Sequence, residues 1–217
     1  MSTTPNVAPL QITVLGASGA TGLQLVRQAL DRGHTVVAVA RRPERIDVPD
    51  GERLLRRAGD VTDPDSIAEA LRDSTIVVSG LGVVGGERGG VLSAGARAVI
   101  AARPERMVWL GAFGTGPSAA SAGPLTRSLL RVVLRAEIED KVRADALVLG
   151  AGGSVVHAGP LSNRPESASP RGVLLSQVPR RLFPASISRA SVASVMLDAA
   201  QSGVRGVIVP LINPVGK

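Results

Sequence analysis

The chain has 217 residues, a length that suits one α/β domain with a modest appendage. It has no cysteine and no tyrosine, which excludes disulfides, thiolate catalysis, sulfur metal ligands and any mechanism that needs a tyrosine acid. The net charge is +7, but the arginines are scattered without interleaved aromatic residues, so we expect neither a nucleic-acid partner nor a bound metal.

The N-terminal segment, residues 1–9, is short and polar and lacks the pattern of a signal peptide, so we expect it to be disordered. No stretch of the chain is long and apolar enough to span a membrane. We therefore expect a cytoplasmic protein without a membrane partner, a monomer or small homo-oligomer that acts on a small-molecule substrate. Residues 10–217 are expected to form one domain.

Short apolar runs alternate along the chain with segments of helical periodicity. Gly33 is expected to end the first helix, and Thr62 is expected to cap the second. Residues 113–125 and 159–187 are predicted to be loops that shape a small substrate pocket. Strands are predicted over residues 11–16, 34–40, 53–58, 74–79, 107–111, 154–157 and 204–209, and helices over 20–32, 62–71, 89–102, 124–149 and 188–201.

This alternation predicts an α/β fold, a single-domain Rossmann-type doubly wound parallel sheet with helices on both faces. Gly16, Gly19 and Gly22 lie between the first strand and the first helix. Such glycines allow a tight turn, a close approach to a pyrophosphate and close packing of the helix on the strand. The spacing is G-x-x-G-x-x-G rather than G-x-G-x-x-G, and a Gly-rich turn without a ligand is the alternative.

The end of the second predicted strand indicates which nicotinamide cofactor is bound. An NAD enzyme needs a carboxylate there for the ribose 2′-hydroxyl, but this chain has Arg41 and Arg42. Guanidinium groups can form paired hydrogen bonds with a 2′-phosphate, so the sequence favours NADP(H). The alternative is that one or both arginines point into solvent.

Two further segments follow strands and are expected at the same edge of the sheet. Asp60 and Val61 would flank the adenine, although Asp60 also fits as a residue beside the start of the second helix. Ser79, Gly80 and Leu81, followed by Gly82, would pass beneath the ribose, where small residues allow a close approach.

The run VLGASGATGLQLVRQALDRGHTVVAVARRPERI resembles the N-terminal half of the atypical short-chain dehydrogenases/reductases. More narrowly, it is similar to the NAD(P)H-binding branch that includes flavin and biliverdin reductases and the NmrA-like proteins. The similarity continues through GDVTDPDSIAEAL, VVSGLG and MVWLGAFGTG and covers most of residues 11–200.

The resemblance implies a set of cofactor contacts and two positions near the chemistry. Lys141 matches a lysine or histidine on a long helix, and His157 begins the segment that closes the sixth strand. Relatives often carry a serine pair at Gly111-Ala112, and many use a Tyr-x-x-x-Lys pair that this chain lacks. The implied phosphate contacts are Gly16, Ser18, Gly19, Ala20 and Thr21, and the implied nicotinamide neighbours are Gly111, Ala112 and Phe113.

Lys141 and His157 are therefore the candidate catalytic residues. Lys141 has charged neighbours, so a solvated lysine on a helix face is the alternative to a catalytic or cofactor-binding role. His157 ends an apolar strand at the ligand edge and can titrate near neutrality, but a histidine bonded to a backbone carbonyl is an equal alternative. His34 lies at the opposite edge and is expected to be structural.

Three functions remain open from the sequence. The first is a reductase that passes hydride from NADPH to an electron-poor ring such as a quinone or flavin, whose reduced anion takes its proton from water. The second is an NADP(H)-binding sensor without chemistry, as the NmrA-like resemblance permits. The third is an enzyme that reduces, epimerises or cyclises a specific metabolite.

Overall fold

The structure, a computed structural model, describes residues 8–82, 89–121, 135–178 and 186–212. The N-terminal residues expected to be disordered lie almost entirely outside this part. The same is true of the first half of the helix predicted from residue 124 to 149; its second half is α5, Arg135–Gly150.

The described chain is organised around one eight-stranded sheet with the order β3-β2-β1-β4-β5-β6-β10-β8. Neighbouring strands run parallel except β8, which pairs antiparallel with β10 at one edge. A short parallel pair, β7 (Leu161–Ser162) with β9 (Ile187–Ser188), lies apart from it. The strands of the large sheet are β1 Gln11–Leu15, β2 Thr35–Ala40, β3 Leu54–Ala58, β4 Ile76–Ser79, β5 Arg106–Ala112, β6 Ser154–Ala158, β8 Pro170–Leu174 and β10 Gly206–Ile212.

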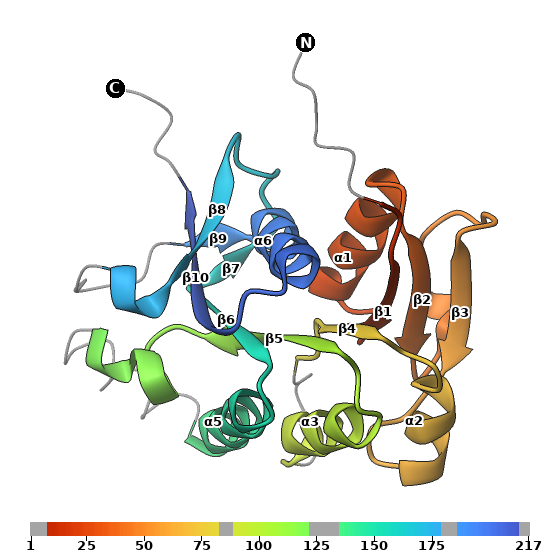
Figure 1. Ribbon diagram of the computed structural model, residues 1–217, viewed down its shortest axis with the longest axis horizontal. Helices are drawn as coiled ribbons and strands as arrows, with labels where there is room; N and C mark the ends of the chain where they lie inside the picture. The colour runs from red at the N-terminus through yellow and green to blue at the C-terminus, as the bar shows by residue number, and fades with distance from the viewer. Residues whose placement is uncertain (1–7, 83–88, 122–134, 179–185, 213–217) are drawn as a thin grey trace.

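Helices cover both faces of this sheet, as the predicted doubly wound fold requires (Figure 1). On one face α1 (Ala20–Asp31) packs beside α6 (Arg189–Ser202). On the other face α3 (Val91–Ala101) packs between α5 and α2 (Pro64–Ala70). Each layer has its own aliphatic core, because strands buried on both faces carry apolar side chains without alternation.

Three local predictions were wrong. The cap of α2 is Asp63, whose carboxylate accepts hydrogen bonds from the backbone N–H groups of Asp65 and Ser66, and Thr62 instead donates to Asp60. The predicted loop after β5 contains a short 3₁₀ helix, Gly116–Ser121. The segment 159–187, predicted to be a loop, contains the strand β8. An edge strand needs little apolar burial, so its proline and polar residues gave no strand pattern in the sequence.

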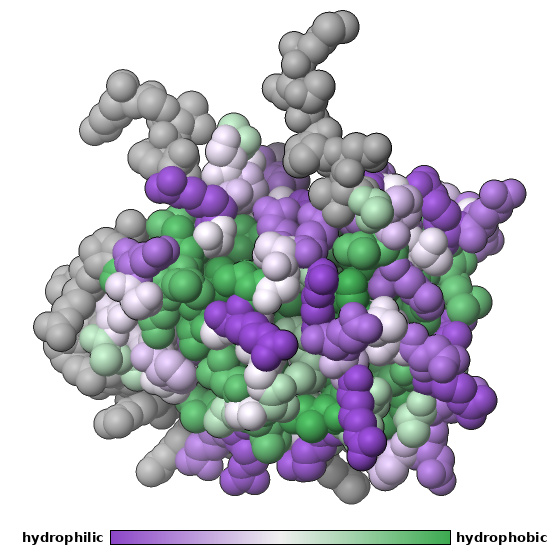
Figure 2. All heavy atoms as spheres, viewed as in Figure 1, coloured by the Kyte–Doolittle hydropathy of each residue, from purple (hydrophilic) through white to green (hydrophobic). Residues whose placement is uncertain are grey.

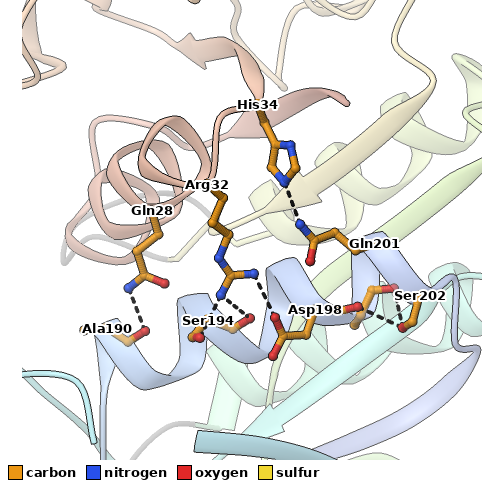
Figure 3. A network of polar contacts seen from close by, with 9 residues as sticks. Gln28, Arg32, His34, Ala190, Ser194, Asp198, Gln201 and Ser202 are labelled. Atoms are coloured by element: carbon orange, nitrogen blue, oxygen red, sulfur yellow. Dashed lines mark hydrogen bonds and ion pairs between the residues drawn. The ribbon is translucent and has the colours of Figure 1, made fainter. Parts of the chain in front are cut away.

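The seam between α1 and α6 holds a polar network (Figure 3). Arg32 donates to Asp198 at 2.7 Å, and Gln28 donates to the Ala190 carbonyl. The His34 ring is buried, and its Nε2 atom lies 2.6 Å from the amide nitrogen of Gln201. This contact confirms a structural role for His34. Burial, and then the nearby Arg32 charge, lower the pKa of His34.

The surface is mixed in polarity over the face shown in Figure 2, with hydrophilic residues prominent at its periphery. Among the described residues, the exposed large apolar side chains are those of Leu55, Leu174 and Val204. No helix among the described residues is long and apolar enough to cross a lipid bilayer.

Candidate functional site

A cleft opens at the carboxyl ends of the central strands, where β1 lies between β2 and β4. The chain leaves β1 toward β2 on one side and later returns to place β4 on the other. This reversal leaves a crevice that the connecting segments do not cover, the usual ligand site of open α/β sheets. The cleft has two halves, both lined by Gly19, Gly80, Leu81 and Gly82.

The glycine loop forms the floor where the two halves meet. Gly16 has a φ of +76°, a conformation that favours glycine. A Cβ at Gly22 would lie 2.1 Å from the Gly16 carbonyl oxygen, so α1 approaches the loop as closely as backbone allows. Gly19 caps α1 without a side-chain hydrogen bond, so the first-turn N–H groups and the positive end of the helix dipole are presented to an anion. The loop therefore fits a dinucleotide pyrophosphate.

One half of the cleft lies between the loop and the ends of β2 and β3, and we call it the adenine half after the group predicted to bind there. Asp60 and Val61 both line it, and their contact with an adenine stays a prediction. The Asp60 carboxylate also accepts two hydrogen bonds from Thr62, from N–H at 2.9 Å and from Oγ1 at 2.7 Å. These bonds, with a smaller contribution from the Arg41 charge, hold the pKa of Asp60 below its ordinary value despite partial burial. Asp60 is thus an ionised group tied to its own turn.

The two arginines after β2 differ in position. Arg41 is exposed and lies on the lining of the adenine half, close enough to Asp60 to act on its pKa. Arg42 is also exposed, but it precedes the 3₁₀ helix Pro43–Arg45 and is not part of that lining. The structure therefore brings one of the two predicted phosphate ligands to the cleft.

The other half lies against the ends of β5 and β6, and we call it the nicotinamide half after the group predicted to bind there. Gly111 and Ala112 line it, together with Ala158 and Gly159, which follow His157 in the sequence, and their contact with a nicotinamide stays a prediction. Phe113 does not: its side chain is buried in a small cluster with Val209. Ser79 is also buried below the surface, and its Oγ accepts a bond from the Leu81 N–H.

Lys141 projects from α5 into the nicotinamide half, and its Nζ donates to the Leu110 carbonyl of β5 at 3.2 Å. The preceding residue, Asp140, anchors α5 because its carboxylate accepts bonds from the Leu92 and Ser93 N–H groups at the start of α3. Burial lowers the pKa of Lys141, and the carboxylates of Asp145 and Asp140 oppose that effect. The alternative of a solvated lysine is therefore wrong.

His157 lies beneath the same half and is fully buried. Its Nδ1 is 2.6 Å from Ser118 Oγ, and its Nε2 is 3.2 Å from Asp145 Oδ2, without the alignment of a hydrogen bond. The ring packs against Gly111, where a Cβ would come within 2.5 Å of its Cδ2 atom. His157 does not line the cleft, and its partners are side chains rather than a backbone carbonyl.

Ser118 and Asp145 are functional candidates that the sequence interpretation missed. Both side chains are fully buried. The Ser118 hydroxyl accepts from the Gly114 N–H at 2.9 Å and contacts His157, which fixes the loop after β5 over β6. One signal was present: Asp145 follows Lys141 by four residues, a spacing that places both on one side of a helix. The described residues contain no cluster of histidines and carboxylates suited to a metal ion.

The sheet order, the switch-point cleft and the glycine loop define a dinucleotide-binding protein of the Rossmann type. The sequence model of the NAD(P)H-binding family matches residues 16–202, so the chain belongs to that family. This confirms the resemblance derived from the sequence. No curated protein matches the chain in sequence.

Solved structures show the same fold. The anaerobilin reductase ChuY of Escherichia coli O157:H7 is 18% identical, with a TM-score of 0.72 over 95% of this chain and 98% of that one. A short-chain dehydrogenase/reductase of Veillonella parvula, in complex with NADP, is 16% identical, with a TM-score of 0.74 over 96% of both chains. A candidate epimerase of Bacteroides thetaiotaomicron is 20% identical, with a TM-score of 0.74 over 97% of this chain and 100% of that one.

Proposed function

We propose that this chain is an NADPH-dependent reductase that transfers hydride to an electron-poor, aromatic small molecule such as a quinone or a flavin. The observation that carries the proposal is the lining of the nicotinamide half. Gly111, Ala112, Ala158 and Gly159 present little more than backbone at the ends of β5 and β6, which leaves room for a flat ring. The same strand ends offer no hydroxyl acid, and the chain has no tyrosine.

Preference for NADPH over NADH is part of the proposal. The end of β2 carries Arg41 at the lip of the adenine half, where an NAD enzyme would carry a carboxylate. The nearest acid of that half, Asp60, already accepts two bonds from Thr62. The NADP complex of the Veillonella protein supports the same choice.

When bound, NADPH supplies the hydride. The chain's own residues then have three tasks: the glycine loop orients the dinucleotide, Gly111 and Ala112 keep the ring face open, and Lys141 brings positive charge to the cleft. Reduction of a simple ketone builds up alkoxide charge that needs a positioned acid. An oxidised quinone or flavin gains the hydride in the cleft and becomes a delocalised reduced anion, which takes its proton from water afterwards.

A panel of acceptors tests this proposal by the loss of NADPH absorbance under steady-state conditions. We expect saturable oxidation with quinones or free flavins. Unactivated aliphatic ketones should be slower by about a hundredfold or more, because loss of a positioned acid typically costs about a hundred- to ten-thousandfold. Rapid, saturable reduction of such a ketone would show that Lys141 or another group acts as an acid. Tight NADPH binding with no turnover of any acceptor would instead favour the sensor.

A further inference from the structure

The charged side chains that line the nicotinamide half are both basic. They are Lys141 on α5 and Arg189, the first residue of α6; the other lining residues are neutral. Both side chains are half-buried, and neither forms an ion pair within the part of the chain that the structure describes. Among the described residues, the lining carries two partly desolvated cations and no acid, so it is electrostatically complementary to an anion.

Arg189 is held at the outer end of this half by a small, defined support. The pair β7–β9 aligns Leu161 with Ile187 and Ser162 with Ser188, which brings Arg189 next to the Leu161 edge of the cleft. Its Nη1 donates to Asn163 Oδ1 at 2.7 Å. This bond uses one of the five guanidinium donors and fixes the orientation of the fork without neutralising its charge.

The cofactor phosphates have binding groups of their own. The pyrophosphate is accounted for by the glycine loop and the N-terminus of α1, and a 2′-phosphate by Arg41 on the adenine half. Arg189 lines the nicotinamide half and not the adenine half, and it shares that half with Gly19, Ala20 and Thr21 of the loop. Because the loop and Arg41 account for the cofactor phosphates, the charge of Arg189 is left for a second anion.

We infer that the molecule reduced in this cleft is an anion whose carboxylate or phosphate group is bound by Arg189, with its electron-poor ring beside Lys141. The inference rests on the proposed reductase function and narrows its substrate class. An anionic group also fits the chemistry of Lys141: burial lowers the pKa of its ammonium, and a bound anion opposes that loss of charge.

Matched acceptors that differ in one anionic group test the inference. Riboflavin and FMN share a ring and differ by a phosphate, and a naphthoquinone with or without a carboxylate side chain provides the second pair. We expect the wild type to have a KM for each anionic member about tenfold to a hundredfold below that for its neutral partner. The two pairs also distinguish a phosphate ligand from a carboxylate ligand.

Arg189→Gln should raise the KM for the anionic acceptors by the same factor and leave the neutral acceptors and the Kd for NADPH unchanged. Arg189→Lys should recover part of the loss, since it keeps the charge but not the planar fork. Arg171→Gln, on the exposed part of β8, is the matched control and should change neither value. Equal KM values within each pair in the wild type would overturn the inference. So would a weaker Kd for NADPH in Arg189→Gln, because Arg189 would then serve the cofactor.

An equilibrium binding experiment tests this inference separately from the reductase proposal. FMN and riboflavin are titrated into protein saturated with NADP⁺, and binding is followed by flavin fluorescence, which requires no turnover. Tighter binding of FMN that Arg189→Gln abolishes would support the anion site even if no acceptor oxidised NADPH. Equal binding of the two flavins would contradict the anion site even if both were reduced.

Discussion

The two halves of the cleft present different chemical groups to a ligand. On the loop, the surface offered to a ligand is mainly backbone: Gly16, Gly19 and Gly22 permit close approach, and the first-turn N–H groups of α1 are left without a side-chain cap. In the nicotinamide half the charged groups on the lining are side chains from separate elements, Lys141 from α5 and Arg189 from α6. Backbone recognition of phosphates suits any substrate, whereas side chains set which acceptor is reduced and how.

We expect the substitution Gly22→Ala to have the largest effect, because it disrupts the glycine loop. The new Cβ would lie 2.1 Å from the Gly16 carbonyl oxygen and 2.8 Å from the Ala17 Cα, both of which are backbone atoms that cannot rotate away. We expect the free energy of unfolding to fall by about 3 kcal/mol, the upper part of the usual range for overpacking, and NADPH binding to be lost. Chemical denaturation measures the first effect and calorimetry the second. Gly51→Ala, where a Cβ meets nothing within 4 Å, is the control and should leave both unchanged.

The nicotinamide half depends on the packing of the His157 ring against Gly111, which His157→Ala removes. The ring is fully buried and contacts Ser118 while supporting Gly111, so its loss leaves a cavity under the nicotinamide half. We expect a loss of about 2–3 kcal/mol of stability and a clear drop in turnover, with NADPH affinity nearly intact. His34→Ala, the other buried histidine, should lower stability without changing turnover per folded molecule, since it lies at the opposite edge. Full turnover in His157→Ala would contradict the role of His157 in positioning Gly111.

Arg41 and Arg42 allow a finer comparison within the adenine half. Arg41 lies on its lining and Arg42 does not, so Arg41→Ala should weaken NADPH by about tenfold, the lower end for a charge-assisted hydrogen bond. Arg42→Ala is the matched control and should have a smaller effect, and NADH affinity should be spared in both. Calorimetric titration of each variant with both cofactors measures this. Equal loss from the two variants would mean that Arg42 also reaches the phosphate.

The smallest expected effect is a pH dependence of stability that reports on Lys141. Its pKa in the folded chain is below the ordinary value of 10.5, so the unfolded chain binds more protons between the two values. The free energy of unfolding should therefore rise with pH through that window. Because the chain has no tyrosine or cysteine and only one other lysine, Lys217, few groups obscure the signal. Lys141→Met should abolish the rise and Lys217→Met should keep it; a rise that persists in Lys141→Met would contradict the lowered pKa.

The sequence predicted the backbone half better than the side-chain half for a physical reason. The glycine loop is one contiguous segment whose spacing and flanking elements encode its geometry, so Gly16, Gly19 and Gly22 were found directly. The contacts of His157 join residues from β6, α5 and the loop after β5, and no local pattern connects Ser118, Asp145 and His157. The charged run around Lys141 indicated solvent, because sequence alone does not show that α5 packs against α3 and β5.

The central claim is that the two halves act together as a reductase, and single-turnover kinetics test it most directly. Protein loaded with less than one equivalent of NADPH is mixed without oxygen with excess quinone, and the NADPH absorbance is followed. The account predicts a rapid, complete decay whose rate saturates with quinone concentration and is lost in the Gly22→Ala variant. NADPH that stays bound and unoxidised at saturating quinone and flavin concentrations would contradict the claim and leave a dinucleotide-binding protein without this chemistry.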